Sequence, residues 1–407
     1  MLHPQSRGLI FLLGAVTGLT ALAIDMSLPA LPTLQAIFSA SADQAALTLS
    51  MFLAGYSVSQ LAYGPLSDRY GRRPPLLAGL ALFTIGGIGC AASGSIGQLI
   101  LWRLLQGFGA CAGPILARAV VRDLFERRRG VQILSYMTLV MSVAPLLAPI
   151  IGGYLLRVGW RTIFALLAAV GLAVLAATWL ALPESIPERN RHAVRPASLL
   201  RNLIEFSTRR ICVGYALVVC FVFCGLFAYI SASPFVFIEV FGVSSDRYGY
   251  FFGLTAFALM AGATANARLS GRIAPAVILR LGSALIAVAG AAMLVCGAFG
   301  LGGLAGIIGP MLLYVVGMAL VMPNAIAAAM EPVPHMAGFA SSLIGCLQTA
   351  GGSLVGYILG AVYNRSALPL ALGVSVSAAL VAITYFGWLN RAGTGQPPAV
   401  PTRKGED

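Results

Sequence analysis

Apolar runs of about 20 residues recur from one end of this 407-residue chain to the other. Wound as a helix, a run of that length crosses the roughly 30 Å of hydrocarbon in a lipid bilayer. Only 10% of the residues are charged, whereas a soluble globular domain carries about 25%. The sequence therefore predicts an all-α polytopic membrane protein.

Two other membrane-related interpretations fit less well. A β-barrel needs alternating segments of about 10 residues, whereas the runs here are continuous, as in ALLAAVGLAVLAATWLAL at 165–182. The apolar stretch after Arg7 is too long for a cleaved signal peptide, and Asp25 and Pro29 interrupt it. We expect this stretch to be the first membrane span.

Glycine, proline and arginine residues divide the apolar runs into twelve expected helices. Their centres lie near residues 20, 55, 84, 107, 143, 171, 220, 255, 286, 314, 348 and 378. The polar stretch at 183–208 divides the chain into a six-helix bundle at 1–182 and another at 209–390. The tail at 391–407 lacks apolar periodicity, which predicts disorder.

The basic residues predict the orientation. With both termini in the cytoplasm, 21 of the 26 Lys and Arg residues fall on the cytoplasmic side and four on the other, with Arg103 inside a span. Cytoplasmic loops of membrane proteins carry such an excess. We therefore expect residues 183–208 to be a cytoplasmic loop, and the net charge of +13 to reflect topology rather than nucleic-acid binding.

The seven cysteines do not indicate a disulfide framework or a metal site. All of them fall in apolar segments, their number is odd, and no CxxC occurs. No metal and no cofactor are expected.

Asp25 is the one acid clearly within an expected span, and Arg103 is the one base. Gly14, Gly18 and Ala21 share the helix face of Asp25, so this face can line a crevice or another helix. A charge inside the membrane is costly, and by default it faces a cavity or a partner. Burial favours the neutral carboxyl and a nearby guanidinium favours the ionised one, so a rearrangement could load or release a proton.

Several interpretations of these two residues stay open. Asp25 could carry a proton, pair permanently with Arg103, or cap the span near the outer surface. Arg103 could instead extend its side chain to the interface. Pro29 and Pro32 are expected to bend the chain and end the first span at the outer surface, just past the acid.

The most specific motif is GPLSDRYGRR at 64–73, after the second expected span. Gly64 would allow close backbone contact, Gly71 a tight turn, and Asp68 could cap a helix start. A basic loop that only sets the topology is the alternative interpretation. The residues of interest here are Gly64, Asp68, Arg69, Gly71, Arg72, Arg73 and, further along, Asp123.

Two further stretches combine small residues with helix breakers. In ILWRLLQGFGACAGPILARAVVRD (100–123), Arg103, Gly107, Ala110 and Pro114 share one helix face. In APLLAPIIGG (144–153), the spacing predicts a bent helix that another helix can approach closely. The residues of this second motif are Pro145, Pro149, Gly152 and Gly153.

Other polar side chains within the expected spans are candidates for lining a substrate cavity. Each of them could equally satisfy a hydrogen bond between helices. They are Tyr56, Gln60, Gln106, Tyr136, Tyr229, Asn324 and Gln348.

The motifs resemble those of a known family. GPLSDRYGRR is similar to the loop signature G-x-L-x-D-R-x-G-R-R of the major facilitator superfamily, and ARLSGRIAP (267–275) echoes it in the second half. The resemblance implies twelve helices in two six-helix bundles. It also implies a cytoplasmic latch in which Asp68 and Arg72 meet Asp123 and the start of the eleventh span.

Further stretches resemble one branch of that superfamily, the Bcr/CflA drug:H⁺ antiporters. They are IDMSLPALP, MSVAPLLAPIIGG, SASPFVFIE and PHMAGFASSL. The resemblance implies a monomer in the bacterial inner membrane that exports bicyclomycin- or chloramphenicol-type compounds by rocker-switch alternating access. Asp25 would be the proton-coupling acid and Arg103 the buried arginine of the fourth span. Ala148 replaces the glycine of the usual fifth-span signature.

Two other functions stay open. A symporter or exporter of an endogenous metabolite could use the same fold, although the sparse intramembrane charge favours drug export. A membrane enzyme or receptor would need a cluster of His, Asp and Glu residues or a sizeable soluble domain, and the sequence contains neither.

Overall fold

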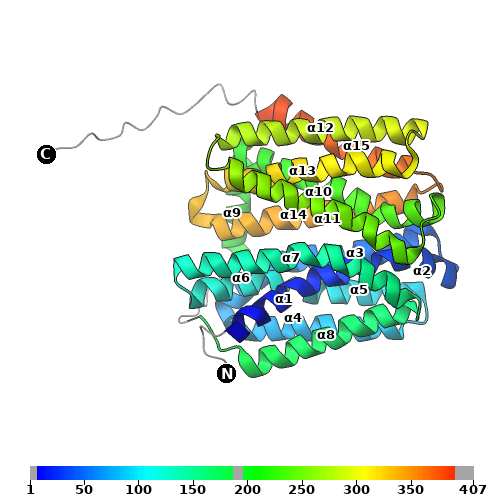
Figure 1. The fold of residues 1–407 in the computed structure, drawn as a ribbon. Helices are drawn as coiled ribbons and strands as arrows, with labels where there is room; N and C mark the ends of the chain where they lie inside the picture. The colour runs from blue at the N-terminus through cyan, green and yellow to red at the C-terminus, as the bar shows by residue number, and fades with distance from the viewer. Residues whose placement is uncertain (1–6, 187–195, 390–407) are drawn as a thin grey trace.

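The fold is an all-helical bundle in which long helices run side by side (Figure 1). The structure, a computed structural model, describes residues 7–186 and 196–389, and these ranges contain no strand. Twelve helices within them are long and apolar enough to cross a membrane, and each contains one of the expected centres. The predicted all-α membrane fold is therefore confirmed. Helices suit a bilayer because they satisfy every backbone polar group internally.

The first six spans, shown in blue to teal in Figure 1, form the N-terminal half. Their elements are α1 (Arg7–Asp25), the short 3₁₀ helix η1 (Leu28–Ala30), α2 (Leu31–Ile37), α3 (Ala42–Tyr70), α4 (Arg73–Ala92), α5 (Ile96–Ala110), α6 (Ala112–Leu124), α7 (Arg127–Leu156) and α8 (Trp160–Ala181).

The last six spans form the C-terminal half, shown in green to red. Their elements are α10 (Arg210–Phe235), η2 (Val236–Val240), α11 (Ser245–Leu269), α12 (Pro275–Phe299), α13 (Gly303–Met330), η3 (Pro334–Met336), α14 (Ala337–Ala361), α15 (Leu368–Ala382) and η4 (Ile383–Leu389). Between the halves, α9 (Pro196–Thr208) is a helix within the stretch expected to be a loop. The tail at 391–407 lies outside the described residues.

The first span is interrupted inside the molecule, which corrects the expectation that Pro29 and Pro32 end it at the outer surface. Helix α1 stops at Asp25, and the chain continues through η1 and α2 as far as Ile37. Leu28, Pro29 and Ala30 of η1 are all buried. Pro29 and Pro32 lie at the first positions of η1 and α2, where a proline needs no backbone N–H donor.

The two halves meet along two seams, one between α3 and α14 and the other between α7 and α11. We call the end of the bundle that carries Arg69–Arg73 and Arg209–Arg210 the arginine-rich end, and the other the opposite end. The described N-terminus of α1 lies at the arginine-rich end, where α9 crosses from one half to the other (Figure 1). This arrangement positions every feature of the site described below.

Candidate functional site

Asp25 lies at the point where α1 breaks, and it is only 5% exposed. The face of α1 that carries it packs on α7. A Cβ atom added to Gly14 or Gly18 would lie 3.5 or 3.3 Å from a methyl group of Val140. The predicted small-residue face is therefore the surface along which α1 contacts α7.

The Asp25 carboxyl has no partner within the described part of the chain, where it makes neither a side-chain hydrogen bond nor an ion pair. The turn beyond it packs against α10 and α11 of the C-terminal half. Tyr248 of α11 is close enough to interact electrostatically with Asp25, and its hydroxyl shares a 2.9 Å hydrogen bond with Ser233 of α10. The acid thus lies beside the turn at which the two halves meet, within electrostatic reach of a tyrosine that the sequence analysis did not single out.

Arg103 is 1% exposed and is held by groups of its own half. Its Nε donates to the Thr48 carbonyl at 3.3 Å, and Nη1 donates to Gln106 Oε1 at 2.8 Å. Nη2 donates to Ser27 Oγ at 3.5 Å. The guanidinium carbon also lies 4.4 Å from the centre of the Phe52 ring, a cation–π geometry.

These contacts distinguish between the two interpretations of Arg103 left open by the sequence, a side chain that extends to the interface and a permanent pair with Asp25. The side chain is enclosed, so it does not extend to the interface. No ion pair joins it to Asp25 among the described residues, so the permanent pair is not the arrangement in this conformation. Ser27, two residues beyond Asp25, links Arg103 to the break in the first span.

The fourth span packs closely through the predicted face. A Cβ on Gly107 would lie 2.0 Å from the Phe52 carbonyl oxygen of α3. The Ala110 carbonyl accepts a 3.0 Å hydrogen bond from Thr20 of α1. The span breaks at Cys111, between α5 and α6. Arg103 is therefore fixed on a span that contacts both α1 and α3.

The fifth-span motif holds α7 against both halves. A Cβ on Gly152 would lie 2.2 Å from the Met26 carbonyl oxygen, and one on Gly153 would lie 2.5 Å from the Ser245 carbonyl oxygen. Pro145 and Pro149 lie within α7, and Ala148 is fully buried. Close packing here joins the break after Asp25 to the first turn of α11.

The two halves are closed against each other at the opposite end. Arg157 of the N-terminal half forms an ion pair with Asp246 of the C-terminal half. The hydroxyls of Tyr154 and Tyr250 lie 3.2 Å apart in the same region. Asp25 is on the closed side of the molecule.

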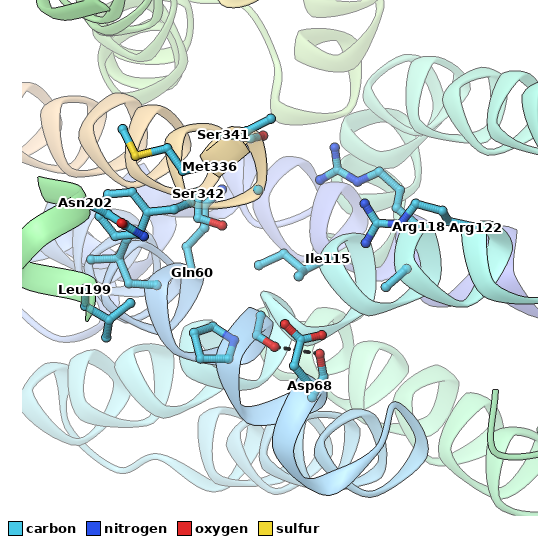
Figure 2. Close-up of a pocket in the computed structure, with 18 of the residues that line it drawn as sticks. Gln60, Asp68, Ile115, Arg118, Arg122, Leu199, Asn202, Met336, Ser341 and Ser342 are labelled. Atoms are coloured by element: carbon cyan, nitrogen blue, oxygen red, sulfur yellow. Dashed lines mark hydrogen bonds between the residues drawn. The ribbon is translucent and has the colours of Figure 1, made fainter. Parts of the chain in front are cut away.

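At the arginine-rich end, a cavity of about 740 Å³ lies between the halves. Residues of α3, α6, α9 and α14 line it, and Figure 2 shows their side chains converging from these helices. Gln60 is the one member of the predicted cavity set that lines this space. Tyr56 lies one helical turn before Gln60, on the same face of α3.

The structure does not gather the remaining cavity candidates at this site. Asn324 donates at 2.9 Å to Asn266 of α11, the helix–helix hydrogen bond considered above as its alternative role. Tyr229 is fully buried among aromatic rings, and Tyr136 is 61% exposed on α7. Gln348 is partly buried and makes no hydrogen bond with a described residue.

Gln106 has a different position from the one expected for it. It is fully buried beside Arg103, and its Nε2 has no hydrogen-bond partner in the described structure. Its amide oxygen is occupied by Arg103 Nη1. Gln106 therefore orients the buried arginine in this conformation.

The loop motif forms a charged cluster within the N-terminal half. Arg72 Nε donates to Asp123 Oδ2 at 2.8 Å, and Nη1 donates to Asp68 and, at 2.7 Å, to Ser67. Burial opposes the charge of Arg72, but the hydrogen bonds to Asp123 and Asp68 outweigh it and hold its pKa above the ordinary value. Arg69 stacks on the Tyr70 ring with its guanidinium carbon 5.1 Å from the ring centre.

Glu184, which the sequence analysis did not select, completes this cluster. Its Oε1 accepts from the Arg72 backbone N–H at 2.7 Å and its Oε2 from that of Arg73 at 3.3 Å, so it caps the start of α4. Gly71 adopts φ +99°, and a Cβ there would meet Glu184 Oε2 at 2.4 Å. The only sequence signal for this role was an acid directly after the sixth span.

Three expectations for the motif are corrected. Asp68 lies in the last turn of α3 and pairs with Arg72 rather than capping a helix start. Gly64 has no atom within 4 Å of an added Cβ, because it faces the cavity. Among the described residues, no hydrogen bond or ion pair joins Asp68, Arg72 or Asp123 to the start of the eleventh span, because the cavity separates them.

The start of the eleventh span contacts α9 instead. His335 Nε2 lies 3.3 Å from Glu205 Oε2. The hydrogen bond with His335, with a second from Arg209, holds the pKa of Glu205 below its ordinary value. Among the described residues, no group of three or more His, Cys, Asp or Glu side chains is arranged to hold a metal ion.

The fold and its motifs can be compared with known proteins. The family description "Major Facilitator Superfamily" matches residues 13–356. The chain belongs to this superfamily. In a superfamily of transporters, two helical halves with a cavity between them form the candidate pathway for a small-molecule substrate.

Related proteins of the superfamily include several with resistance names. An "Uncharacterized MFS-type transporter YdgK" of Bacillus subtilis is 34% identical over 97% of this chain and 100% of its own. A "Bicyclomycin resistance protein homolog" of Haemophilus influenzae is 30% identical over 95% and 97%. The "Multidrug resistance protein MdtL" of Escherichia coli is 28% identical over 88% and 90%.

Solved transporters share the fold at low sequence identity. A mutant of the nucleoside transporter NupG has a TM-score of 0.75 at 12% identity, covering 94% of this chain and 99% of its own. The inward-open xylose transporter XylE of E. coli has a TM-score of 0.72 at 17% identity, covering 93% and 95%. These similarities confirm the fold, whereas membership of the superfamily follows from the family match and the twelve spans from the helices themselves.

Proposed function

We propose that this protein is a drug:H⁺ antiporter that exports small amphipathic antibiotics, such as bicyclomycin- or chloramphenicol-type compounds, by rocker-switch alternating access. The observation that carries the proposal is the unpartnered, 5% exposed Asp25 at the break in the first span, where the two halves meet. The resistance names of relatives at 28–30% identity support drugs as the cargo.

The proposed orientation places the arginine-rich end and both termini in the cytoplasm of a bacterial cell, with the spans in its inner membrane. The excess of basic residues at that end supports it. The conformation is then open to the cytoplasm and closed towards the outside by Arg157, Asp246 and the tyrosine pair.

The proposed coupling follows from what the Asp25 carboxyl meets. An ionised carboxylate without a partner is costly when buried, so the inward-open state holds Asp25 protonated. Arg103 is kept from Asp25 by Thr48, Gln106 and Ser27. When a drug enters from the cytoplasm and the halves rearrange, hydration or an approach of Arg103 would favour the ionised form and release the proton.

No cofactor enters the proposal, because the proton gradient is the energy source. One chain has both halves of the pathway, so a monomer suffices. A symporter of the same fold would move protons and substrate in one direction. The direction of substrate flux distinguishes the two functions.

The decisive variant is Asp25→Asn, which preserves size and removes the titrating group. We expect cells that produce the wild-type protein to tolerate a drug from a panel that includes bicyclomycin and chloramphenicol. The Asp25→Asn variant should fall to the level of cells without the protein while its amount in the membrane is unchanged. In detergent, the wild type should release protons on drug addition and the variant should not.

Asp43→Asn is the matched control. Asp43 is a partly exposed acid in the first turn of α3 that makes no ion pair with a described residue. It should keep full resistance. Wild-type resistance in Asp25→Asn would exclude the coupling mechanism, and proton-driven uptake of the compound would favour the symporter.

A further inference from the structure

The cavity at the arginine-rich end has an uneven charge. Among its lining residues, Asp68 is paired with Arg72, which Asp123 also contacts. His335 at the mouth faces Glu205. Two arginines of the lining, Arg118 and Arg122, form no ion pair with a described carboxylate.

Arg118 and Arg122 form an arginine pair on one face of α6. Their spacing of four residues places them one above the other along the helix. Figure 2 shows both side chains extending from α6 at the cavity, next to Ile115. Both residues are exposed.

Most hydrogen-bonding groups of the pair have no partner among the described residues. Arg118 uses only its Nε, which donates to the Pro114 carbonyl at 2.7 Å and so holds the side chain along the helix. Arg122 makes no hydrogen bond or ion pair with a described residue. Two neighbouring guanidinium groups with free terminal N–H donors match the geometry of a carboxylate or phosphate group.

The remaining lining supplies an apolar surface and a few uncharged polar groups. Ile115, Met336 and Phe339 are apolar, while Ser341 and Ser342 offer hydroxyls from α14. Figure 2 places Ser341, Ser342 and Met336 on the other side of the space from Asp68, with Ile115 near its centre. A molecule held here would meet cations on one side and an apolar surface beside them.

We propose that this cavity binds amphipathic anions more tightly than their neutral counterparts, with the acidic group bound between Arg118 and Arg122 and the apolar body against Ile115, Met336 and Phe339. The inference rests on the proposed export function. It extends the cargo from uncharged compounds of the bicyclomycin and chloramphenicol type, which would meet only the apolar surface, to acidic amphipathic molecules that also meet the arginine pair. Arginines near the end of a span are ordinarily explained by their effect on membrane orientation. The proposal gives Arg118 and Arg122 an additional role in binding the substrate.

The test uses the purified full-length chain and a matched pair of probes. The probes are 1-naphthylacetate, an anion with an aromatic body, and 1-naphthylacetamide, its neutral counterpart. Calorimetric titration should show that the anion binds at least about tenfold more tightly than the amide. Equal affinities in the wild type would overturn the proposal.

The double variant R118Q/R122Q should bind the two probes equally while its affinity for the amide stays at the wild-type level. Retained binding of the amide shows that the variant is folded. R122Q alone is the second variant, because Arg122 makes no hydrogen bond or ion pair with a described residue, so its replacement should leave the helix intact. A preference for the anion that survives in R122Q and in the double variant contradicts the inference.

The matched control is R268Q/R272Q. These arginines are also four residues apart, exposed and at the arginine-rich end, but they do not line the cavity. The control removes the same charge, so the preference for the anion should persist in this variant. Its loss would show that general positive potential, rather than the arginine pair, attracts the anion.

An anionic lipid headgroup has the same chemistry as the proposed ligand. Titrations in phosphatidylcholine nanodiscs are therefore compared with nanodiscs that also contain phosphatidylglycerol. The preference for the free anion should be present in both. If phosphatidylglycerol abolishes it, the pair is a lipid site and the proposal is wrong. If the preference for the anion is not found, the loss of resistance in Asp25→Asn is still expected. The anion preference and the proposed antiport can therefore be refuted separately.

Discussion

Gly107 illustrates how a single missing side chain positions the buried arginine. The backbone of α5 lies so close to α3 that an added Cβ would be 2.0 Å from the Phe52 carbonyl oxygen. Arg103 lies one turn earlier on the same helix face and stacks on the Phe52 ring. The same close approach thus serves both the packing and the environment of the charge.

Gly107→Ala should separate α5 from α3, since the atom it meets is backbone and cannot move aside as a flexible side chain could. Overpacking of this kind costs about 1–3 kcal/mol. We expect a lower thermal unfolding midpoint in detergent and weaker resistance. Gly97→Ala in the same helix is the control, because nothing lies within 4 Å of its added Cβ. Equal midpoints for the two variants would contradict the close packing.

At the scale of the helix, the start of α4 depends on a residue more than 100 positions away. Helix starts leave backbone N–H groups without acceptors, and the N-cap residue Arg72 provides no side-chain cap. Glu184 accepts from two of these N–H groups. The end of the sixth span therefore fixes the start of the third.

Glu184→Ala should remove this cap and lower stability by about 1 kcal/mol, as loss of a cap typically does. Glu184→Gln should have a smaller effect because it retains one acceptor oxygen. The thermal unfolding midpoints of the purified variants test this order. Glu126→Ala is the matched control, because Glu126 begins α7 without a side-chain capping bond. A larger loss in Glu126→Ala than in Glu184→Ala would refute the assignment.

At the scale of the whole molecule, the halves are joined at one end and separated at the other. Glycines of α14 bring it close to α3 at the opposite end, where a Cβ on Gly360 would lie 2.7 Å from the Ala46 Cβ. The cavity lies between the same two helices at the arginine-rich end. A rocking motion of one half would close the cavity and part these helices at the opposite end.

Cysteines introduced at Ala46 and Gly360 should therefore form a disulfide in this conformation, because the added Cβ lies 2.7 Å from the Ala46 Cβ and a shift of about 1 Å reaches the Cβ separation of about 3.5–4.5 Å that a bridge spans. A protease site placed between the halves allows the cross-link to be seen as fragments that stay together without reductant. Resistance or transport should be lost on oxidation and return on reduction. The single variants A46C and G360C are the controls. Full transport in the cross-linked protein would exclude a motion that opens this end.

Much of this architecture follows from the sequence alone. Twelve apolar runs define twelve spans, because a bilayer admits only backbones that satisfy their own hydrogen bonds. The resemblance of GPLSDRYGRR to the superfamily's loop signature implied the contacts of Arg72 with Asp68 and Asp123. The spacing within the loop did not indicate them by itself. Asp25 and Arg103 stood out because charge is rare inside a membrane.

Only the tertiary structure decided which of these groups meet. Periodicity places a residue on a helix face, but the partner of that face depends on how helices far apart in the chain pack. Hence Asn324, a cavity candidate in the sequence, bonds to Asn266 of another helix. Asp25, for which the sequence offered Arg103 as a partner, has no described partner. The sequence determined the fold and its charged residues. The packing of the two halves determined where the cavity opens and which charges remain free within it.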